Sequence, residues 1–152
     1  MFRNTLSAQS FRSTIMSAKR FNSSITPVSP PPAASYSQAV KANGFIYVSG
    51  QIPYTAENKP LPASSTTQDY AEQAIQNVSA ILEAANSSLK HIVKANIFLT
   101  DMKAQFGDFN QVYGKYFNEH KPARSCVAVK ELPLGVPLEI EVIAVEKDDT
   151  KL

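Results

Sequence analysis

Arg124 is the side chain whose place in the sequence most suggests chemistry. It opens a run of small and β-branched residues, RSCVAV at 124–129, which favours a strand. Strand alternation then places Arg124 on the same face as Cys126. A guanidinium held on a rigid strand can bind a carboxylate through two parallel hydrogen bonds. The same pattern fits a structural ion pair with Glu139 or Glu141, and the residue types alone do not decide between the two roles.

Glu139 is the second candidate, because it is a carboxylate inside an otherwise apolar run. The segment Leu138–Glu146 alternates, with Glu139 and Glu141 on one face and apolar residues on the other, which predicts a strand. An internal carboxylate is costly unless it is paired or functional. Near an arginine, Glu139 could hold a water molecule or transfer a proton. Its alternative role is again that of an ion-pair partner for Arg124.

Other catalytic patterns are absent from the sequence. It contains no G-x-S-x-G, no phosphate-binding loop and no zinc signature. Cys126 is the single cysteine, so an internal disulfide is impossible. His91 and His120 stand far from each other and from Cys126, which gives no metal-ligand spacing. We therefore predict no metal site. We interpret His120 as a structural residue at the C-terminal end of a helix, where a positively charged histidine interacts favourably with the helix dipole.

Three further segments are predicted to form the strands that support these side chains. Ser37–Ala42 and Phe45–Ser49 flank Asn43-Gly44, a pair that is typical of a tight hairpin turn. Ile92–Thr100 alternates in the period of a strand. The residues predicted to share one face are Val93, Ala95, Ile97 and Leu99.

Two helices are predicted between the strands. The first spans roughly residues 67–85, where apolar residues recur at helical spacing after a capping box formed by Thr66 and Asp69. The second runs from Lys103 to Glu119 and is stopped by Pro122. Its aromatic stripe, which we expect to lie in the core, comprises Phe106, Phe109, Tyr113, Tyr116 and Phe117.

The order of elements is ββαβαββ, which predicts an α+β two-layer sandwich with two helices on one face of a mostly antiparallel sheet. The other face of the sheet would be left uncovered. Glu139, Glu141, Ile143 and Val145 would lie on it. Mixed charged and apolar residues on an uncovered face predict a subunit interface with an embedded polar site.

The bulk composition indicates a single globular domain. The chain has 152 residues, of which 43% are hydrophobic, and no apolar run approaches the ~20 residues of a membrane-spanning helix. Its net charge is +2, but four of its fifteen basic residues lie in the first 22, where there is no acidic residue. The rest of the chain has eleven basic and thirteen acidic residues, so the domain has no basic excess to attract a phosphate backbone.

The N-terminus has the composition of a mitochondrial presequence. Residues 1–22 are basic, free of acidic residues and rich in hydroxyl groups, with Phe2 and Leu6 four residues apart as in an amphipathic helix. A basic tail that stays on the protein is the alternative. Residues 23–34 are rich in Pro, Ser and Ala and predict a linker. The domain is then expected to span residues 35–148.

Four segments resemble the Rid/YjgF (reactive-intermediate deaminase) family in order and spacing, and its yeast mitochondrial members in particular. They cover about Ala34 to Glu146. They read ASYSQAVKANGFIYVSGQIP, AEQAIQNVSAILEAANSSL, IVKANIFLTDM followed by FNQVYGKYF, and PARSCVAVKELPLGVPLEIEVIAVE.

The resemblance implies a chorismate-mutase-like fold and a homotrimer with its sites in the clefts between subunits. It also implies hydrolysis of 2-imino acids, such as 2-iminobutanoate and 2-iminopropanoate, to 2-oxo acids and ammonia without a cofactor. These imines arise from pyridoxal-phosphate dehydratases acting on threonine or serine. The implied setting is the mitochondrial matrix, where the activity would support isoleucine synthesis or protect enzymes.

The resemblance also assigns roles to individual residues. Arg124 matches the arginine that binds the substrate carboxylate, and Glu139 matches the glutamate that holds the attacking water. Tyr36 matches a tyrosine that closes over the substrate. The other matches are Gly50 and Cys126, whose backbone groups touch the ligand, and Asn110, which lies near the site.

Two other functions are open. A ribonuclease or translation inhibitor is the first, and the slightly acidic domain disfavours it because nucleic-acid surfaces combine basic residues with aromatic ones. A module that only binds small carboxylates is the second. Arg124 would be enough for such a module, whereas hydrolysis also requires Glu139.

Overall fold

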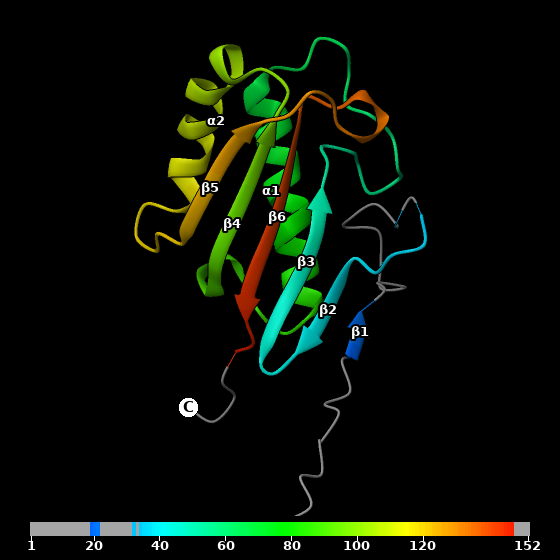
Figure 1. The fold of residues 1–152 in the computed structure, drawn as a ribbon, viewed down its shortest axis with the longest axis vertical. Helices are drawn as coiled ribbons and strands as arrows, with labels where there is room; N and C mark the ends of the chain where they lie inside the picture. Colours follow the sequence, from blue (N-terminus) through cyan, green and yellow to red (C-terminus); the bar gives the residue numbers. More distant parts are fainter. Residues whose placement is uncertain (1–18, 22–31, 33, 148–152) are drawn as a thin grey trace, which may run out of the picture.

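The computed structural model describes residues 19–21, 32 and 34–147. Six strands form one sheet in the order β1-β2-β3-β6-β4-β5, and Figure 1 shows them side by side. The strands are β1 (Lys19–Phe21), β2 (Ala39–Ala42), β3 (Phe45–Gln51), β4 (Ile92–Leu99), β5 (Ala123–Ala128) and β6 (Leu138–Val145). The helices are α1 (Thr67–Ala84) and α2 (Met102–Tyr116), with short 3-10 turns η1 (Leu89–His91) and η2 (Pro133–Gly135).

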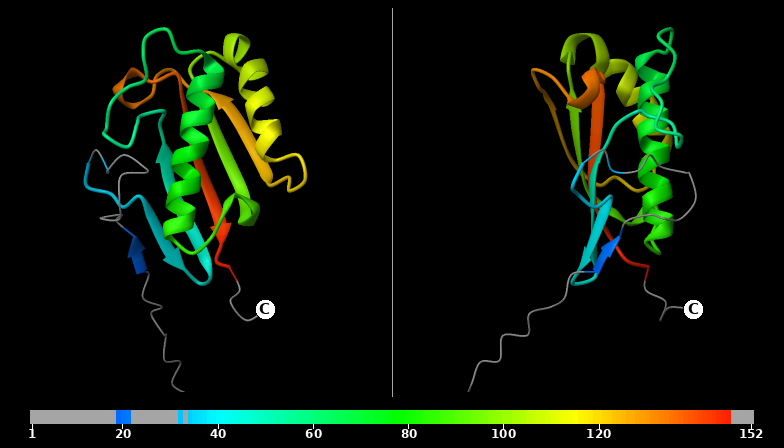
Figure 2. Two further views of the ribbon diagram at one scale, coloured as in Figure 1. Left: turned by 180° about the vertical axis from the view of Figure 1, so that it is seen from behind. Right: turned by 90° about the vertical axis from the view of Figure 1, so that its right-hand side faces the viewer.

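Both helices cover the same face of the sheet, as the side view in Figure 2 shows. The predicted α+β sandwich is therefore confirmed. All pairings are antiparallel except that between β4 and β5, which is parallel. A parallel pair needs a long crossover, and α2 provides it between these two strands.

The core fills the space between the sheet and the helices. α1 begins at the predicted capping box, in which the Thr66 side chain accepts from the Asp69 amide and the Asp69 carboxylate accepts from the Thr66 amide. It buries Ile75, Val78 and Leu82 against the sheet. Along β6 every second residue is buried, which leaves Glu139, Glu141, Ile143 and Val145 on the uncovered face as predicted.

The helices are also joined to each other. The Tyr116 hydroxyl of α2 donates a hydrogen bond to the Glu72 carboxylate of α1. Burial, together with the bond to Glu72 and its charge, raises the pKa of Tyr116 to about 12. A phenol that stays protonated remains a donor, so this bond fixes α2 against α1 over the whole physiological pH range.

One prediction for β4 is wrong. Val93 was expected to share a face with the residues that are buried further along the strand, but it is 39% exposed, and Ile92 is fully buried in its place. The pairing with β6 shifts between Ile92 and Lys94, which marks a bulge. Because a bulge adds one residue to one strand, it reverses the faces of the residues before it.

β1 was not predicted. It comes from the segment that we interpret as a presequence, and it pairs antiparallel with β2 at the edge of the sheet. The rest of that segment, residues 1–18 and 22, lies outside the described residues, as do residues 23–31 and 33 of the predicted linker. Neither of the described helices has the length and apolar character that crossing a bilayer requires.

Candidate active site

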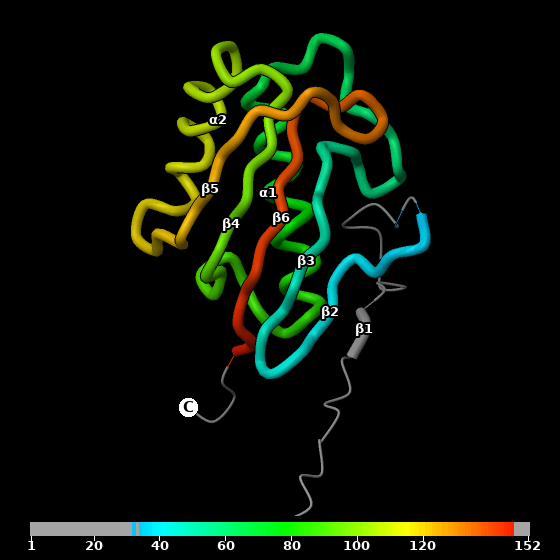
Figure 3. The backbone as a smooth tube through the Cα atoms, viewed as in Figure 1, coloured from blue at the N-terminus to red at the C-terminus, as the bar shows by residue number. Residues whose placement is uncertain are grey.

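A cavity of about 340 Å³ lies at the end of β3, beside β6. It is lined by Tyr36, Ser49, Gly50, Ile52, Pro133, Leu134 and Glu139. Three of the six residues that the sequence singled out, Tyr36, Gly50 and Glu139, are thus brought together. The loop that carries η2 passes beside the end of β3, as the tube in Figure 3 shows. Segments that are distant in the chain therefore meet here.

Gly50 packs directly against the Glu139 carboxylate. The β3–β6 pairing shifts between Val48 and Gln51, which marks a bulge in the segment that contains Gly50. A Cβ atom at position 50 would lie 1.7 Å from Glu139 Oε1. Only glycine leaves room for the carboxylate at this distance, so the glycine serves this contact.

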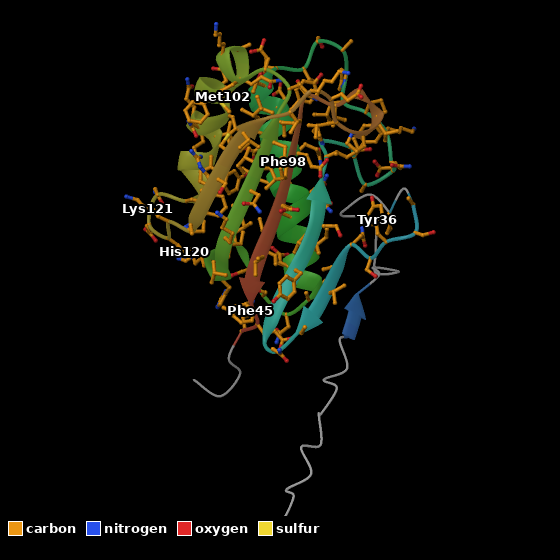
Figure 4. The ribbon with its side chains drawn as sticks, viewed as in Figure 1. Tyr36, Phe45, Phe98, Met102, His120 and Lys121 are labelled. Carbon is orange, nitrogen blue, oxygen red and sulfur yellow. The ribbon has the colours of Figure 1, made fainter. Side chains whose placement is uncertain are left out.

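Tyr36 is tied to the same wall through its neighbours. The Ser49 hydroxyl donates to the Ser37 carbonyl at 2.7 Å, and the Ser49 amide donates to the Gln38 carbonyl at 2.9 Å. These bonds hold the segment before β2 beside the end of β3. The Tyr36 ring is 45% exposed and lies at the β2 side of the sheet in Figure 4. It is placed at the mouth of the cavity rather than in the core.

The part of the cavity wall that contains Ile52 is held from α1. Asn77, which is fully buried, donates to the carbonyls of Ile52 and Tyr54, both at 3.0 Å. Its own carbonyl oxygen accepts from Gln73 at 3.0 Å. A buried amide with all these bonds made is costly to replace. Asn77 therefore fixes the loop that places Ile52 in the cavity.

Glu139 is a half-buried carboxyl whose surroundings disfavour its charged form. Burial raises the pKa of its carboxyl above the ordinary value, and the negative charge of Glu141 raises it further. Glu141 is held in place by the Asn96 side-chain amide at 2.7 Å. The part of the chain that the structure describes contains no ion-pair partner for Glu139. A carboxyl with a raised pKa holds its proton more readily than an ordinary glutamate does.

Arg124 lies on the other face of the sheet. Its register partner on β4 is Ala95, which is buried under the helices. The guanidinium accordingly contacts α2: Arg124 Nη1 donates to Asn110 Oδ1 at 2.7 Å. Its Cζ atom lies 4.7 Å from the centre of the Tyr113 ring and 5.9 Å from that of Phe106. Such contacts restrain the guanidinium through one of its five N–H donors and its planar face.

The aromatic stripe of α2 is therefore only partly core. Phe109 and Phe117 are buried as expected. The prediction for Phe106 is wrong, because this ring is 38% exposed and lies beside Arg124. Helical periodicity identifies the face of a helix but not where the sheet beneath it ends, and β5 is the edge strand.

The proposed ion pair between Arg124 and an acid of β6 is also absent. Among the described residues, neither Glu139 nor Glu141 pairs with Arg124. One chain thus holds two half-sites. The first comprises Tyr36, Gly50 and Glu139 around the cavity, and the second comprises Arg124, Asn110 and Cys126 at the β5 edge.

Cys126 belongs to the second half-site but has no activated thiol. It packs against the core, and burial raises the pKa of the thiol, an effect that the positive charge of Arg124 partly offsets. A thiol with a raised pKa is mostly protonated at neutral pH and is a poor nucleophile. The Cys126 side chain therefore serves packing.

The histidines have local partners. His120 Nε2 is hydrogen-bonded to the Ile92 carbonyl, and His91 Nδ1 to the Ser88 hydroxyl at 2.8 Å. α2 ends at Tyr116, four residues before His120, so the helix-dipole explanation for His120 is wrong and the bond to Ile92 replaces it. The described residues contain no cluster of three or more His, Cys, Asp or Glu that could hold a metal ion.

Sequence reasoning missed several residues of both half-sites. Ser49, Ile52, Pro133 and Leu134 line the cavity without any motif that marks them. Tyr113 could have been found, since it lies three residues after Asn110 and both share one face of α2.

The family described as Endoribonuclease L-PSP matches residues 26–146, which is most of the chain. The chain belongs to this family, the Rid/YjgF family. The mitochondrial protein MMF1 of Saccharomyces cerevisiae is 60% identical over 134 residues, which cover 86% of this chain and 90% of MMF1. The crystal structure of yeast Mmf1 covers 86% of this chain and 100% of its own, with a TM-score of 0.80 and 58% identity.

A bacterial Rid protein is also similar. The Escherichia coli protein named "Putative reactive intermediate deaminase TdcF" is 41% identical over 119 residues, which cover 76% of this chain and 90% of TdcF. The crystal structure of TdcF with bound serine has a TM-score of 0.73 at 39% identity, and it covers 80% of this chain and 96% of its own. The Rid/YjgF membership predicted from four sequence segments is thereby confirmed.

Proposed function

We propose that this protein is a hydrolytic deaminase of 2-imino acids such as 2-iminobutanoate and 2-iminopropanoate. The reaction adds water across the C=N bond of the imine and releases the corresponding 2-oxo acid and ammonia. The observation that carries this proposal is Glu139, a half-buried carboxyl with a raised pKa that lines the cavity against Gly50. The name of TdcF as a reactive intermediate deaminase supports the same chemistry.

The chemistry asks little of the protein beyond position and proton transfer. The imine carbon is already electrophilic, so a water molecule held beside it needs only a base. In this proposal Glu139 takes a proton from that water as its oxygen bonds to the carbon of the protonated imine, and the C=N π electrons move to the nitrogen, which gives a neutral carbinolamine. Glu139 then returns the proton to the nitrogen and takes the hydroxyl proton as the C–N bond breaks, so that the carbonyl forms and ammonia leaves.

The substrate carboxylate would be bound by Arg124 of a second subunit. The two half-sites of one chain lie on opposite faces of the sheet, so a second copy is needed to bring a guanidinium to the cavity. We propose a homotrimer with three shared sites, in which the uncovered sheet faces meet. Light scattering of the mature protein should give three times the subunit mass. A monomer that retains activity at micromolar concentration would contradict the shared site.

The proposed setting is the mitochondrial matrix, where pyridoxal-phosphate dehydratases would supply the imines. The acid-free N-terminus and the similarity to mitochondrial MMF1 support this. Supporting isoleucine synthesis and protecting mitochondrial enzymes are the proposed roles. N-terminal sequencing of the protein from isolated mitochondria should begin beyond Arg20, and an intact Met1 on the bulk of the protein would contradict the presequence.

The decisive experiment adds the purified protein to a threonine dehydratase reaction and follows the imine. The imine should decay faster with the protein than without it, and ammonia should appear at the same rate. Binding of small carboxylates without faster decay would support a binding module instead. Cleavage of RNA by the same preparation, undiminished by Glu139→Gln, would support the ribonuclease that the family description names.

A further inference from the structure

Leu134 is a strained and exposed residue on the wall of the cavity. Its backbone has φ 57° and ψ 16°, the left-handed conformation that leucine rarely adopts. Its side chain is 62% exposed, although it is large and apolar. Glycine or asparagine would adopt this backbone with less strain. Burial in the core of this chain does not account for a leucine here, and the residue instead lines the cavity.

The turn itself explains how the side chain is presented. η2 begins at Pro133, whose ring fixes its own φ, and ends at Gly135, which also has a positive φ of 68°. Leu134 and Gly135, both with positive φ, form a tight turn at the cavity. Pro133 and Leu134 line the cavity wall. Ile52, held by Asn77, lines the same cavity. These three side chains are apolar, whereas Glu139, Ser49 and Tyr36 supply the polar groups of the lining.

The substrate chemistry decides what an apolar wall can bind. The imine carbon of a 2-imino acid bears three groups: a nitrogen, a carboxylate and the side chain of the parent amino acid. The nitrogen must reach the proton on Glu139, and the carboxylate requires a cation. Only the side chain gains from contact with aliphatic carbon. The cavity of about 340 Å³ has room for the imine group, the attacking water and an aliphatic substituent together.

We propose that Leu134, with Pro133 and Ile52, forms a subsite for the aliphatic side chain of the imino acid. Leu134 is then a specificity-determining residue that favours imines from longer aliphatic amino acids. This inference rests on the proposed function. It predicts that the selectivity of the protein depends on chain length, and that this dependence is carried by Leu134.

The test compares three substrates, the imines generated in place from alanine, 2-aminobutyrate and leucine by an amino-acid oxidase. Each is followed by competition with a nucleophilic trap. Each methylene that the subsite buries should raise kcat/KM by about fourfold, equivalent to about 0.8 kcal/mol. Leu134→Gly should lower kcat/KM about tenfold or more for the leucine-derived imine and less than about twofold for the alanine-derived one.

Two matched variants separate the side chain from the backbone. Leu134→Asn keeps the left-handed turn without the aliphatic group and should behave like Leu134→Gly. Leu134→Met keeps an apolar side chain and should retain most of the selectivity. The melting temperature and the assembly mass of each variant are measured first, because a merely structural role would change these.

The outcomes distinguish the subsite from the function on which it rests. If the wild type accelerates decay of none of the imines, the proposed function fails. If the wild type is active but Leu134→Gly lowers kcat/KM for all three substrates by the same factor, the proposed subsite is wrong. Equal loss together with a changed assembly mass would assign Leu134 to contacts between subunits instead.

Discussion

Gly50→Ala isolates the position of the Glu139 carboxylate without removing it. The added Cβ would lie 1.7 Å from Oε1, 2.5 Å from Cδ and 2.9 Å from Cγ of Glu139. A carbon and an oxygen that are not bonded stay roughly 3.3 Å apart, so Oε1 must retreat by roughly 1.6 Å. The atom that moves is the far end of a flexible side chain, so the displacement should be achieved without unfolding.

The expected effect falls on activity rather than stability. A displacement of about 1 Å from the reactive position can cost about 100-fold in rate, so kcat should fall at least that far. Gly50 does not have a positive φ, so alanine can adopt its backbone, and the reduced entropy of the unfolded chain offsets part of the crowding. The free energy of unfolding should change by no more than about 1 kcal/mol.

The matched control is Gly114→Ala in α2, where an added Cβ would meet nothing within 4 Å. It should leave kcat unchanged and stabilise the protein by up to about 1 kcal/mol. The assay is imine decay in the dehydratase-coupled reaction, with assembly checked by light scattering and stability by thermal unfolding. Normal kcat in an assembled Gly50→Ala variant would refute the role of the Glu139 carboxylate in placing water or transferring a proton.

The remaining predictions concern three charged or aromatic groups. Arg124→Ala should lower kcat/KM by roughly 30- to 1,000-fold, and Arg124→Lys should also be impaired because it lacks the planar pair of donors; near-normal kinetics would return Arg124 to a structural role. Glu139→Gln should lower kcat more than it changes KM. It should also raise the melting temperature at neutral pH. Because the folded state raises the pKa of Glu139, ionisation of this group costs stability as the pH rises from the ordinary value of 4.5 through the folded value. A higher melting temperature of Glu139→Gln that persists well below pH 4.5 would contradict this. Tyr113→Phe should leave KM unchanged, because the Tyr113 hydroxyl is buried without a hydrogen-bond partner in the described part of the chain. Tyr113→Leu should raise KM about two- to fivefold, because it removes the ring that stacks on Arg124. Equal effects of the two changes on KM would exclude that stacking.

The helices and the sheet faces were predictable because they follow from local periodicity. α1, its capping box and the alternation of β6 are each set by residues within one or two turns or strand repeats. The exposure of Val93 was not predictable, because a bulge depends on the register with a neighbouring strand that is distant in the chain. Phe106 escaped for a similar reason, since its exposure depends on where the sheet ends.

The candidate site was predictable in its residues but not in its arrangement. Arg124 and Glu139 stood out as charged groups within apolar strands, and family resemblance supplied the others. Alternation states which residues of one strand share a face, but it does not relate the faces of β5 and β6 to each other. That relation depends on the parallel register of β5 with β4. The separation into two half-sites is therefore information that only the folded sheet contains.

The placement of Arg124 and Glu139 on opposite faces has a genetic consequence under the proposed trimer. A chain damaged at Arg124 still carries an intact Glu139, and a chain damaged at Glu139 still carries an intact Arg124. If the two inactive chains assemble together at random in equal amounts, about one quarter of the interfaces combine the two undamaged groups. A diploid cell that carries one allele of each kind would then keep part of the activity, although neither allele provides any alone. Two alleles with the same damage could not rescue each other.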